Sequence, residues 1–136
     1  MESLIIEPTE FSPRVLLDAR KNKLEISGES RPENAGKFYQ PILDWLDNYY
    51  SLRYWKDSSF DSKPVEVIFE FKFEYFNSTS AKYILDILKK IEMFRREKMD
   101  IKVKWYYDEM DTDMMESGEE FSKMTGVPIE IVVLET

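Results

Sequence analysis

The sequence predicts an α/β fold, with a mixed β-sheet of about five to six strands and helices mainly on one face. Segments in which every second residue is apolar alternate along the chain with segments of helical period. The clearest strand carries charged residues along one side, so one face of the sheet is expected to stay open to water. The 136 residues contain neither repeats nor a linker, so a single domain over residues 1–136 is expected.

Three short apolar segments open the chain, and each is expected to form a strand. In the third, Leu24 and Ile26 alternate with Glu25, which is the pattern of a half-buried strand. Turn residues around Asn22 favour a hairpin between the second and third segments. The three segments are residues 3–7, 14–19 and 23–27. The stretch GESRPENAGKFY follows and is expected to be a loop because of Gly28, Pro32 and Gly36.

A helix is expected next, and Asn34 is placed to cap it. Pro41 lacks an N–H and crowds the preceding turn, so either the helix kinks there or residues 35–40 form a separate first turn. Residues 51–64 contain turn-forming residues and are expected to form a loop. The apolar face of this helix consists of Phe38, Ile42, Trp45, Leu46 and Tyr49.

The clearest strand covers residues 65–76, VEVIFEFKFEYF. One side is apolar and the other is mostly charged, with Ile68 and Phe76 as exceptions. A strand buried on both faces would not carry so many charges, so helices are expected to cover the apolar side only. The apolar side consists of Val65, Val67, Phe69, Phe71, Phe73 and Tyr75, and the charged side of Glu66, Glu70, Lys72 and Glu74.

The second half of the chain continues the alternation of helices and strands. Residues 79–98 have a helical apolar stripe, and residues 101–107 alternate as a strand. An acidic helix follows and is ended by Gly126, although Gly118 in its middle is unfavourable. The segment PIEIVVLE is a final strand. The stripe consists of Ala81, Ile84, Leu85, Leu88 and Ile91, and the candidate caps of the acidic helix are Asp111, Thr112 and Asp113.

The composition argues against several classes of function. The formal net charge is −8, so nucleic acid and anionic membrane surfaces would repel the chain. Neither histidine nor cysteine is present, which excludes Ser-His-Asp and Cys-His catalysis and disfavours zinc and haem sites. No apolar run is long enough for a membrane span or a signal peptide, so a cytoplasmic protein is expected. These features favour a binding or regulatory module without a cofactor over an enzyme.

An acidic cluster between Asp108 and Glu120 raises the alternative of a small divalent-metal-dependent enzyme. Carboxylates bind hard cations, but the spacing lacks the glycine and the alternating ligands of an EF-hand. The other interpretation is a solvated helix start, where acidic residues favour the positive end of the helix dipole. The cluster consists of Asp108, Glu109, Asp111, Asp113, Glu116, Glu119 and Glu120.

Three hydroxyl residues stand in a row where the clearest strand passes into the next helix. Ser78, Thr79 and Ser80 follow Asn77, although a helix cap needs only one such side chain. A phosphoryl group at a helix N-terminus meets unpaired N–H groups and the positive end of the dipole. It would also add nearly two negative charges to an acidic surface and repel a docked partner. The segment therefore suits either a helix cap or a phosphorylation switch.

Three segments carry a resemblance to a known family. SGESRPEN, YFNSTSAKYILDIL and WYYDEMDTDMMESGEEFS resemble, in order and spacing, the SiaC-like family of bacterial regulatory phosphoproteins, from about residue 5 to residue 133. That family is similar in fold to STAS-domain anti-sigma factor antagonists, in which a Ser or Thr at a strand–helix junction is phosphorylated. The resemblance therefore implies a STAS-like sheet with helices on one side.

The resemblance implies a non-enzymatic partner-switching protein of signal transduction. A cognate serine/threonine kinase with the histidine-kinase-like ATPase fold would phosphorylate it, and a PP2C-type phosphatase would reverse the reaction. The unphosphorylated form would bind and regulate a downstream partner such as a diguanylate cyclase, in c-di-GMP signalling and biofilm regulation. Control of transcription, as by an anti-sigma factor antagonist, is the alternative output.

The resemblance also implies which residue accepts the phosphate. The family's acceptor hydroxyl directly follows an Asn, which places it at Ser78, and Thr79 is the next candidate. The GESRPEN loop is expected to border the same surface, because loops of an α/β sheet gather at strand ends. No catalytic or metal-binding residue is expected. The partner-binding residues are expected to be Asn77, Thr79, Ser80, Lys82, Glu29, Pro32, Glu33 and Asn34.

Overall fold

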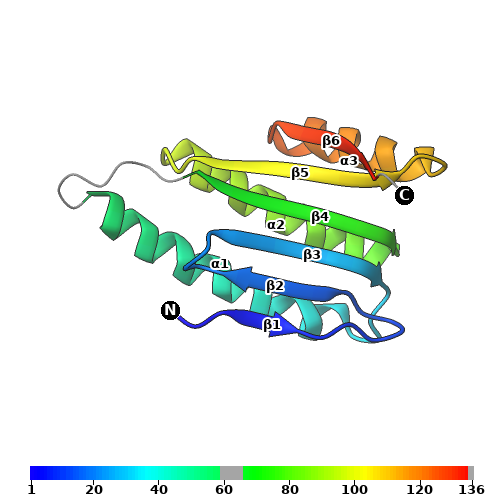
Figure 1. Ribbon diagram of the computed structural model, residues 1–136, viewed down its shortest axis with the longest axis horizontal. Helices are drawn as coiled ribbons and strands as arrows, with labels where there is room; N and C mark the ends of the chain where they lie inside the picture. Colours follow the sequence, from blue (N-terminus) through cyan, green and yellow to red (C-terminus); the bar gives the residue numbers. More distant parts are fainter. Residues whose placement is uncertain (59–65, 135–136) are drawn as a thin grey trace.

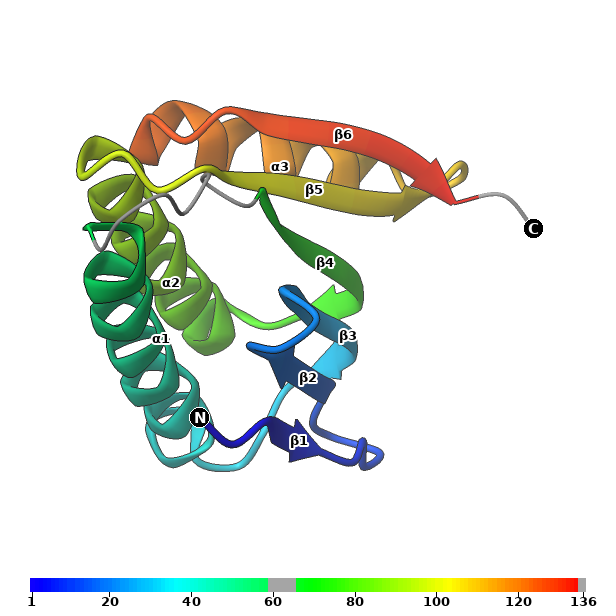
Figure 2. The same cartoon turned by 60° about the vertical axis from the view of Figure 1, so that its left-hand side comes forward.

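A computed structural model describes residues 1–58 and 66–134, in which the strands form one six-stranded sheet in the order β1-β2-β3-β4-β5-β6. The helices lie together on one face of this sheet, as Figures 1 and 2 show. The elements in chain order are β1 (Leu4–Ile6), β2 (Arg14–Asp18), β3 (Lys23–Ser30), α1 (Ala35–Ser58), β4 (Val67–Phe76), α2 (Ser78–Arg96), β5 (Ile101–Asp108), α3 (Thr112–Thr125) and β6 (Ile129–Leu134). The predicted mixed sheet with helices on one side is confirmed.

The strand directions gather several loops at one edge of the sheet. β1, β2 and β3 pair antiparallel, whereas β3, β4, β5 and β6 pair parallel. β1 consequently runs in the same direction as the parallel strands, and the carboxyl ends of all strands except β2 lie at one edge, which we call the carboxyl edge. The β1–β2 loop and the junctions β3–α1, β4–α2 and β5–α3 lie there (Figure 1). This edge is where an α/β sheet usually places its functional groups.

The core lies between the sheet and the helices. Alternate residues of β2 to β5 and the inner faces of the helices are buried, as the two-residue and helical periods predict. Aromatic rings fill its centre: the ring centroids of Phe69 and Phe71 are 4.5 Å apart, and those of Phe71 and Trp105 are 5.6 Å apart. Its largest fully buried side chains include Trp105, Tyr39, Tyr49, Phe69, Phe71 and Phe94.

β3 is longer than its sequence suggests. Gly28 was expected to begin a loop, but β3 continues through it to Ser30. Gly28 has a positive φ of 106°, which glycine adopts without steric cost, and the pairing register with β4 shifts just after it. The hairpin turn before β3 is confirmed, with Asn22 at a φ of 52°.

A β-bulge reverses the predicted orientation at the end of β4. Gly28 pairs with Phe73 and Glu29 pairs with Tyr75, so Glu74 is an extra residue in β4. Tyr75 was expected on the buried side, yet 48% of it is exposed. Phe76 lies on the core side instead, with its ring centroid 6.0 Å from that of Trp105. The bulge is the physical reason, because one inserted residue exchanges the faces of all that follow.

α1 also differs from expectation. It is one continuous helix with Pro41 inside it, so residues 35–40 do not form a separate first turn. The loop expected at residues 51–64 is wrong as far as Ser58, because the helix continues to that residue. The rest of that loop, and Val65 of the predicted strand, lie outside the described residues.

α3 confirms the predicted helix signals. Asp111 is the N-cap, its Oδ1 accepting a hydrogen bond from Met114 N at 3.0 Å, and Gly126 ends the helix in the left-handed conformation. Packing explains why a glycine stands at position 118 inside the helix, because a Cβ there would lie 2.5 Å from Cδ1 of Trp105. Trp105 is fully buried, so its ring has little room to move. The glycine lets α3 approach β5 closely.

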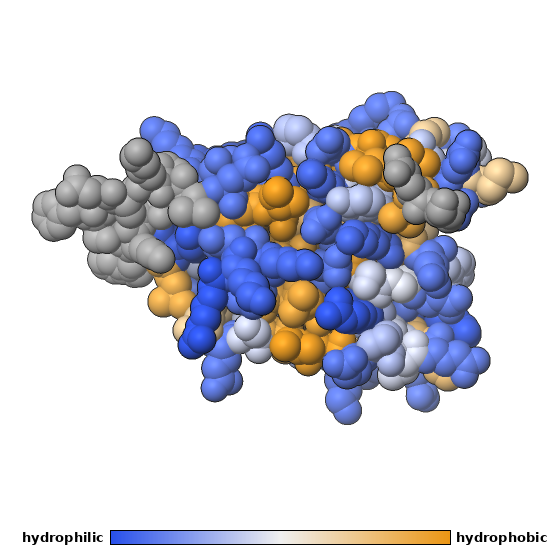
Figure 3. Space-filling model, in the orientation of Figure 1, coloured by the Kyte–Doolittle hydropathy of each residue, from blue (hydrophilic) through white to orange (hydrophobic). Residues whose placement is uncertain are grey.

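The sheet face opposite the helices carries an ion-pair network. Glu25 accepts from Lys72 Nζ at 2.8 Å and from Arg14 at 3.1 Å, and Tyr106 donates to Glu70 at 2.6 Å. Figure 3 shows this face as a mixture of hydrophilic and hydrophobic surface. The carboxylate of Glu25 is buried but pairs with two cations, which offsets the cost of removing it from water. This face can therefore stay uncovered by helices. No helix in the described part of the chain is long and apolar enough to cross a bilayer.

We expect Gly118→Ala to destabilise the protein, although alanine favours a helix. The new methyl group would overlap Trp105, and overpacking of this kind costs about 1–3 kcal/mol. Chemical denaturation should therefore give a lower free energy of unfolding. Glu119→Ala, on the exposed side of the same helix, is the control and should change it little. Unchanged stability of Gly118→Ala would contradict the packing described at Trp105.

We also expect stability to fall at alkaline pH. The hydrogen bond to Glu70, with partial burial, raises the pKa of Tyr106 from 10.0 to about 12. The unfolded state therefore loses this proton first, and stability present below pH 10 is lost as pH rises towards about 12. Denaturation midpoints measured across this range should decline less steeply for Tyr106→Phe. An equal slope in both proteins would show that Tyr106 does not contribute.

Candidate functional site

α2 begins at the carboxyl edge, where Asn77 is its N-cap. The Asn77 Oδ1 accepts a hydrogen bond from the Ser80 backbone N–H at 2.9 Å. The Asn77 backbone N–H donates to the Ser30 carbonyl at 3.0 Å, which ties the start of α2 to the end of β3. The capping side chain is thus an amide, and none of the three hydroxyls is needed for this purpose.

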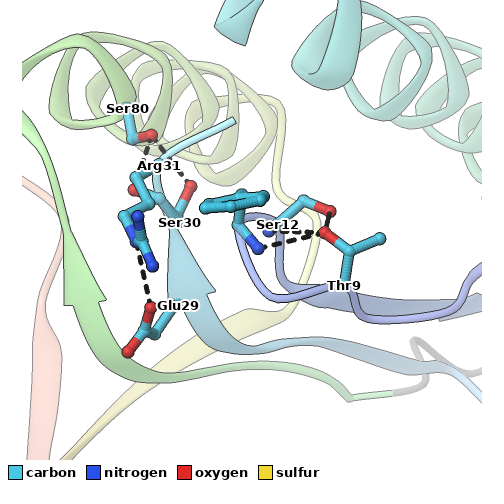
Figure 4. A network of polar contacts seen from close by, with 7 residues as sticks. Thr9, Ser12, Glu29, Ser30, Arg31 and Ser80 are labelled. Carbon is cyan, nitrogen blue, oxygen red and sulfur yellow. Dashed lines mark hydrogen bonds and ion pairs between the residues drawn. The ribbon is translucent and has the colours of Figure 1, made fainter. Parts of the chain in front are cut away.

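Ser80 is fully buried and belongs to a network of hydroxyls. Its Oγ donates to the Ser30 carbonyl at 3.0 Å and accepts from the Ser30 Oγ at 2.8 Å, as Figure 4 shows. The Tyr39 hydroxyl lies 2.5 Å from the Ser30 Oγ. Burial raises the pKa of Tyr39 to about 12, although the bonds to Ser30 and Ser80 oppose this shift. Tyr39 therefore stays protonated and serves as the donor that the Ser30 oxygen needs.

Ser78 and Thr79 differ from Ser80 because both are exposed. Neither hydroxyl has a hydrogen-bond partner within the described part of the chain. Ser80 was expected to shape the partner-binding surface, but its side chain lies inside the protein and cannot touch a partner. Of the three hydroxyl residues, Ser78 and Thr79 therefore face solvent, whereas Ser80 is buried and holds the start of α2 in place.

A groove of about 920 Å³ lies between the first turns of α1 and α2. Glu33 and Asn34, which sequence reasoning assigned to partner binding, line it together with Thr79. The β3–α1 loop and the start of α2 thus share one surface. The full lining consists of Ile6, Glu33, Asn34, Ala35, Gly36, Lys37, Phe38, Pro41, Thr79 and Tyr83.

The wall that α2 contributes to the groove is aromatic. Tyr83 stacks on the buried ring of Tyr39 with a centroid distance of 5.6 Å. Lys82 is exposed, and its Nζ lies 5.3 Å from the centroid of the Tyr83 ring. On the α1 side, Gly36 leaves room for the hydroxyl of Tyr83, which would lie 2.9 Å from a Cβ at that position. The two helix starts therefore approach closely where Gly36 faces Tyr83, and both residues line the groove.

The β1–β2 loop is fastened to the β3–α1 loop by Arg31. The Arg31 N–H donates to the Phe11 carbonyl at 2.8 Å, and its guanidinium lies 4.6 Å from the centroid of the Phe11 ring. Its Nε donates to Glu29 at 3.2 Å (Figure 4). Glu29 lines a second groove of about 440 Å³ on this side, and the half-buried Pro32 lines neither groove. The expected residues Glu29 and Pro32 thus do not line the groove that Thr79 lines.

The carboxyl edge is acidic. Asp108 Oδ1 accepts from the Met110 N–H at 2.9 Å and Asp111 caps α3, so these two carboxylates already hold their own loop. No group of three or more residues that could hold a metal ion occurs in residues 1–58 and 66–134. In the loops, strand ends and first helical turns at this edge, the acidic residues are Glu7, Glu10, Glu29, Glu33, Glu74, Asp108, Glu109, Asp111 and Asp113, and the basic ones are Arg14, Arg31, Lys37 and Lys82.

Sequence reasoning missed the residues that support this site from inside. Ser30 lies in the SGESRPEN segment and Tyr39 in the expected loop, but neither was given a structural role, and Ser30 meets Ser80 across 50 residues of chain. Tyr83 was not singled out, and Gly36 was named only as a loop residue, because a groove between two helix starts depends on how the helices pack. The helical spacing of Tyr39 and Ile42 was the available signal that Tyr39 faces inwards.

Comparison with solved structures shows the same fold. The crystal structure of apo-SiaC from Pseudomonas aeruginosa matches with a TM-score of 0.82 and 23% identity, over 97% of this chain and 99% of that chain. A chain in the crystal structure of the diguanylate cyclase SiaD in complex with its activator SiaC, from the same organism, also matches with a TM-score of 0.82 and 23% identity, over 96% of this chain and 99% of that one.

Sequence comparison covers nearly the whole chain as well. An uncharacterised protein of Pseudomonas aeruginosa (strain UCBPP-PA14) is 27% identical over 131 residues, which are 96% of each protein. The family model described as SiaC family regulatory phosphoprotein matches residues 6–134. The resemblance found in the three sequence segments is thereby confirmed, and the chain belongs to the SiaC family of regulatory phosphoproteins.

Proposed function

We propose that this protein is a non-enzymatic partner switch whose phosphate acceptor is Ser78. The observation that carries the proposal is the division among the three hydroxyls at the start of α2. Ser80 is buried and engaged, whereas Ser78 is exposed at the first position of a helix whose cap is supplied by another residue. A kinase can reach the Ser78 hydroxyl without opening the fold.

The start of α2 is chemically suited to a phosphate on Ser78. Of the first four N–H groups, that of Ser80 is bonded to the Asn77 side chain and that of Ala81 to the Asn77 carbonyl. The N–H groups of Ser78 and Thr79 have no such partner among the described residues, and together with the helix dipole they favour an anion. Lys82 lies one turn along α2 and supplies a positive charge within reach.

The switch has two states that differ in surface and share one fold. The Ser78 side chain makes no contact that the fold needs, so a phosphate there leaves the core intact while changing the charge and shape of the carboxyl edge. In this proposal the unphosphorylated form binds and activates a diguanylate cyclase. Support comes from family membership and from the solved complex of SiaD with its activator SiaC, a chain of which shares this fold.

The proposal assigns the two opposing reactions to separate partners. A serine/threonine kinase with a histidine-kinase-like ATPase fold adds the phosphate, and a PP2C-type phosphatase removes it. Both assignments rest on the family resemblance. Transfer from ATP places the cycle in the cytoplasm, and the protein contributes a hydroxyl and a docking surface to it rather than a catalytic group.

The acceptor assignment is tested with three alanine variants. Incubated with the kinase and ATP, Ser78→Ala should take up no phosphate, whereas Thr79→Ala and Ser80→Ala should still be phosphorylated on Ser78, as mass spectrometry of the intact and digested protein would show. Ser80→Ala should lower the free energy of unfolding by about 1–3 kcal/mol, because it removes both the acceptor of the buried Ser30 O–H and a donor to the Ser30 carbonyl. Phosphate on Ser78→Ala would refute the assignment.

The output is tested with the diguanylate cyclase of the same cells. Unphosphorylated protein and Ser78→Ala should bind this cyclase and raise its rate of c-di-GMP synthesis, whereas the phosphorylated protein should not. Ser78→Asp should bind about tenfold more weakly or worse, corresponding to about 1.4 kcal/mol. Because an acidic residue suits the first turn of a helix, its thermal stability should match that of Ser78→Ala. Equal activation by both phosphorylation states would contradict the switch.

A further inference from the structure

We propose that the groove between the first turns of α1 and α2 receives an apolar side chain of the cyclase that is flanked by basic side chains. This inference rests on the proposed function and identifies where the partner docks and by what chemistry. It also implies that the phosphate on Ser78 acts locally, beside the groove, rather than by long-range repulsion.

The apolar part of the occupant follows from the walls of the groove. The groove has a volume of about 920 Å³, and its apolar surface comes from Ile6 of β1, Phe38 and Pro41 of α1, and the ring of Tyr83. A space of that size is larger than any one side chain, so it takes an apolar side chain together with the residues beside it. Tyr83 is held by its stack on buried Tyr39, so the wall is already in place before a partner arrives.

The basic part of the occupant follows from charge and hydrogen bonding. Acidic residues outnumber basic ones in the described loops of the carboxyl edge. Within the groove, Lys37 is basic and Glu33 is acidic, and the exposed Glu33 has no ion-pair partner among the described residues. Pro41 has no N–H, so the carbonyl of Lys37 lacks the donor that a regular helix would give it. Glu33 and Lys37 both line the groove. The Glu33 carboxylate and the Lys37 carbonyl can therefore accept hydrogen bonds from the N–H groups of a lysine or arginine of the partner.

The sign of this charge constrains how phosphorylation can block docking. An acidic edge attracts a basic partner at a distance, and a phosphate on Ser78 strengthens that attraction. Loss of binding must therefore come from close range. Thr79, next to Ser78, lines the groove, so a hydrated phosphate held at the start of α2 occupies space that the partner needs and keeps water there.

The first test narrows the groove without adding charge. A methyl group at Gly36 would lie 2.9 Å from the Tyr83 hydroxyl, so the Tyr83 ring must shift on Tyr39, whereas alanine favours a helix more than glycine does. Gly36→Ala should therefore melt near the wild-type temperature and Gly36→Leu somewhat below it, and both should be phosphorylated on Ser78 at the wild-type rate. We expect cyclase binding to weaken stepwise, about threefold for alanine and tenfold or more for leucine.

The second test uses two substitutions with the same change in net charge. Glu33→Lys, at the groove, should weaken cyclase binding about tenfold at low salt. Glu97→Lys lies at the C-cap of α2, the length of a helix away, and should bind like the wild type. Affinity of the unphosphorylated protein should fall as NaCl rises from about 50 to 500 mM, while the ratio of affinities between the two phosphorylation states should persist because a local effect is little screened.

The outcomes separate this inference from the proposed function. If the wild type binds the cyclase and Gly36→Leu binds equally well, the groove is not the docking site, although the switch stands. If Glu33→Lys and Glu97→Lys weaken binding equally, or if salt strengthens it, the partner is not basic at this point. If the difference in cyclase affinity between the two phosphorylation states disappears at high salt, long-range repulsion causes the loss of binding, and the local effect proposed here is wrong. If the wild type binds no cyclase, the output and the groove occupant both fail.

Discussion

The structure of this site depends on one backbone carbonyl, that of Ser30. It accepts the N–H of Asn77 and the hydroxyl of Ser80, while the Ser30 side chain bonds to Ser80 and Tyr39. β3, α1 and α2 therefore meet at a single buried point, although they are distant in sequence. Because an unsatisfied buried polar group is costly, all of these groups must be in place together. This requirement fixes where α2 begins and which of its first side chains face water.

The consequence is a separation of roles along four consecutive residues. Asn77 caps the helix, Ser80 anchors it, and the exposed hydroxyls of Ser78 and Thr79 have no hydrogen-bond partner among the described residues. A modification of an exposed residue can then change what the surface attracts while the anchor beneath it stays unchanged. The groove between α1 and α2 lies next to this residue, because Thr79 belongs to its lining and the stacked rings of Tyr39 and Tyr83 form its wall. A phosphate on Ser78 therefore changes the charge at the groove.

Much of the fold could be predicted from the sequence, because strong local signals agree with the packing. The alternation in β4, the cap at Asp111 and the stop at Gly126 all hold. Predictions failed where a distant contact overrides the local pattern. The bulge at Glu74 depends on Gly28 in the neighbouring strand, and it turns Tyr75 outwards. Of the site, the exposed position of Ser78 agrees with expectation, whereas burial of Ser80 depends on Ser30, 50 residues away, and no local pattern indicates that contact.

The placement of three hydroxyls between two lysines has a practical consequence for anyone who maps the modification. Cleavage by trypsin after Lys72 and Lys82 releases the peptide FEYFNSTSAK, in which a phosphate on any of the three hydroxyls gives the same mass. The mass of the intact peptide therefore does not show which of the three hydroxyls carries the phosphate. Fragment ions must separate Ser78 from Thr79, whereas a signal from Ser80 would report protein that had already lost its native structure, since that oxygen is sealed within the fold.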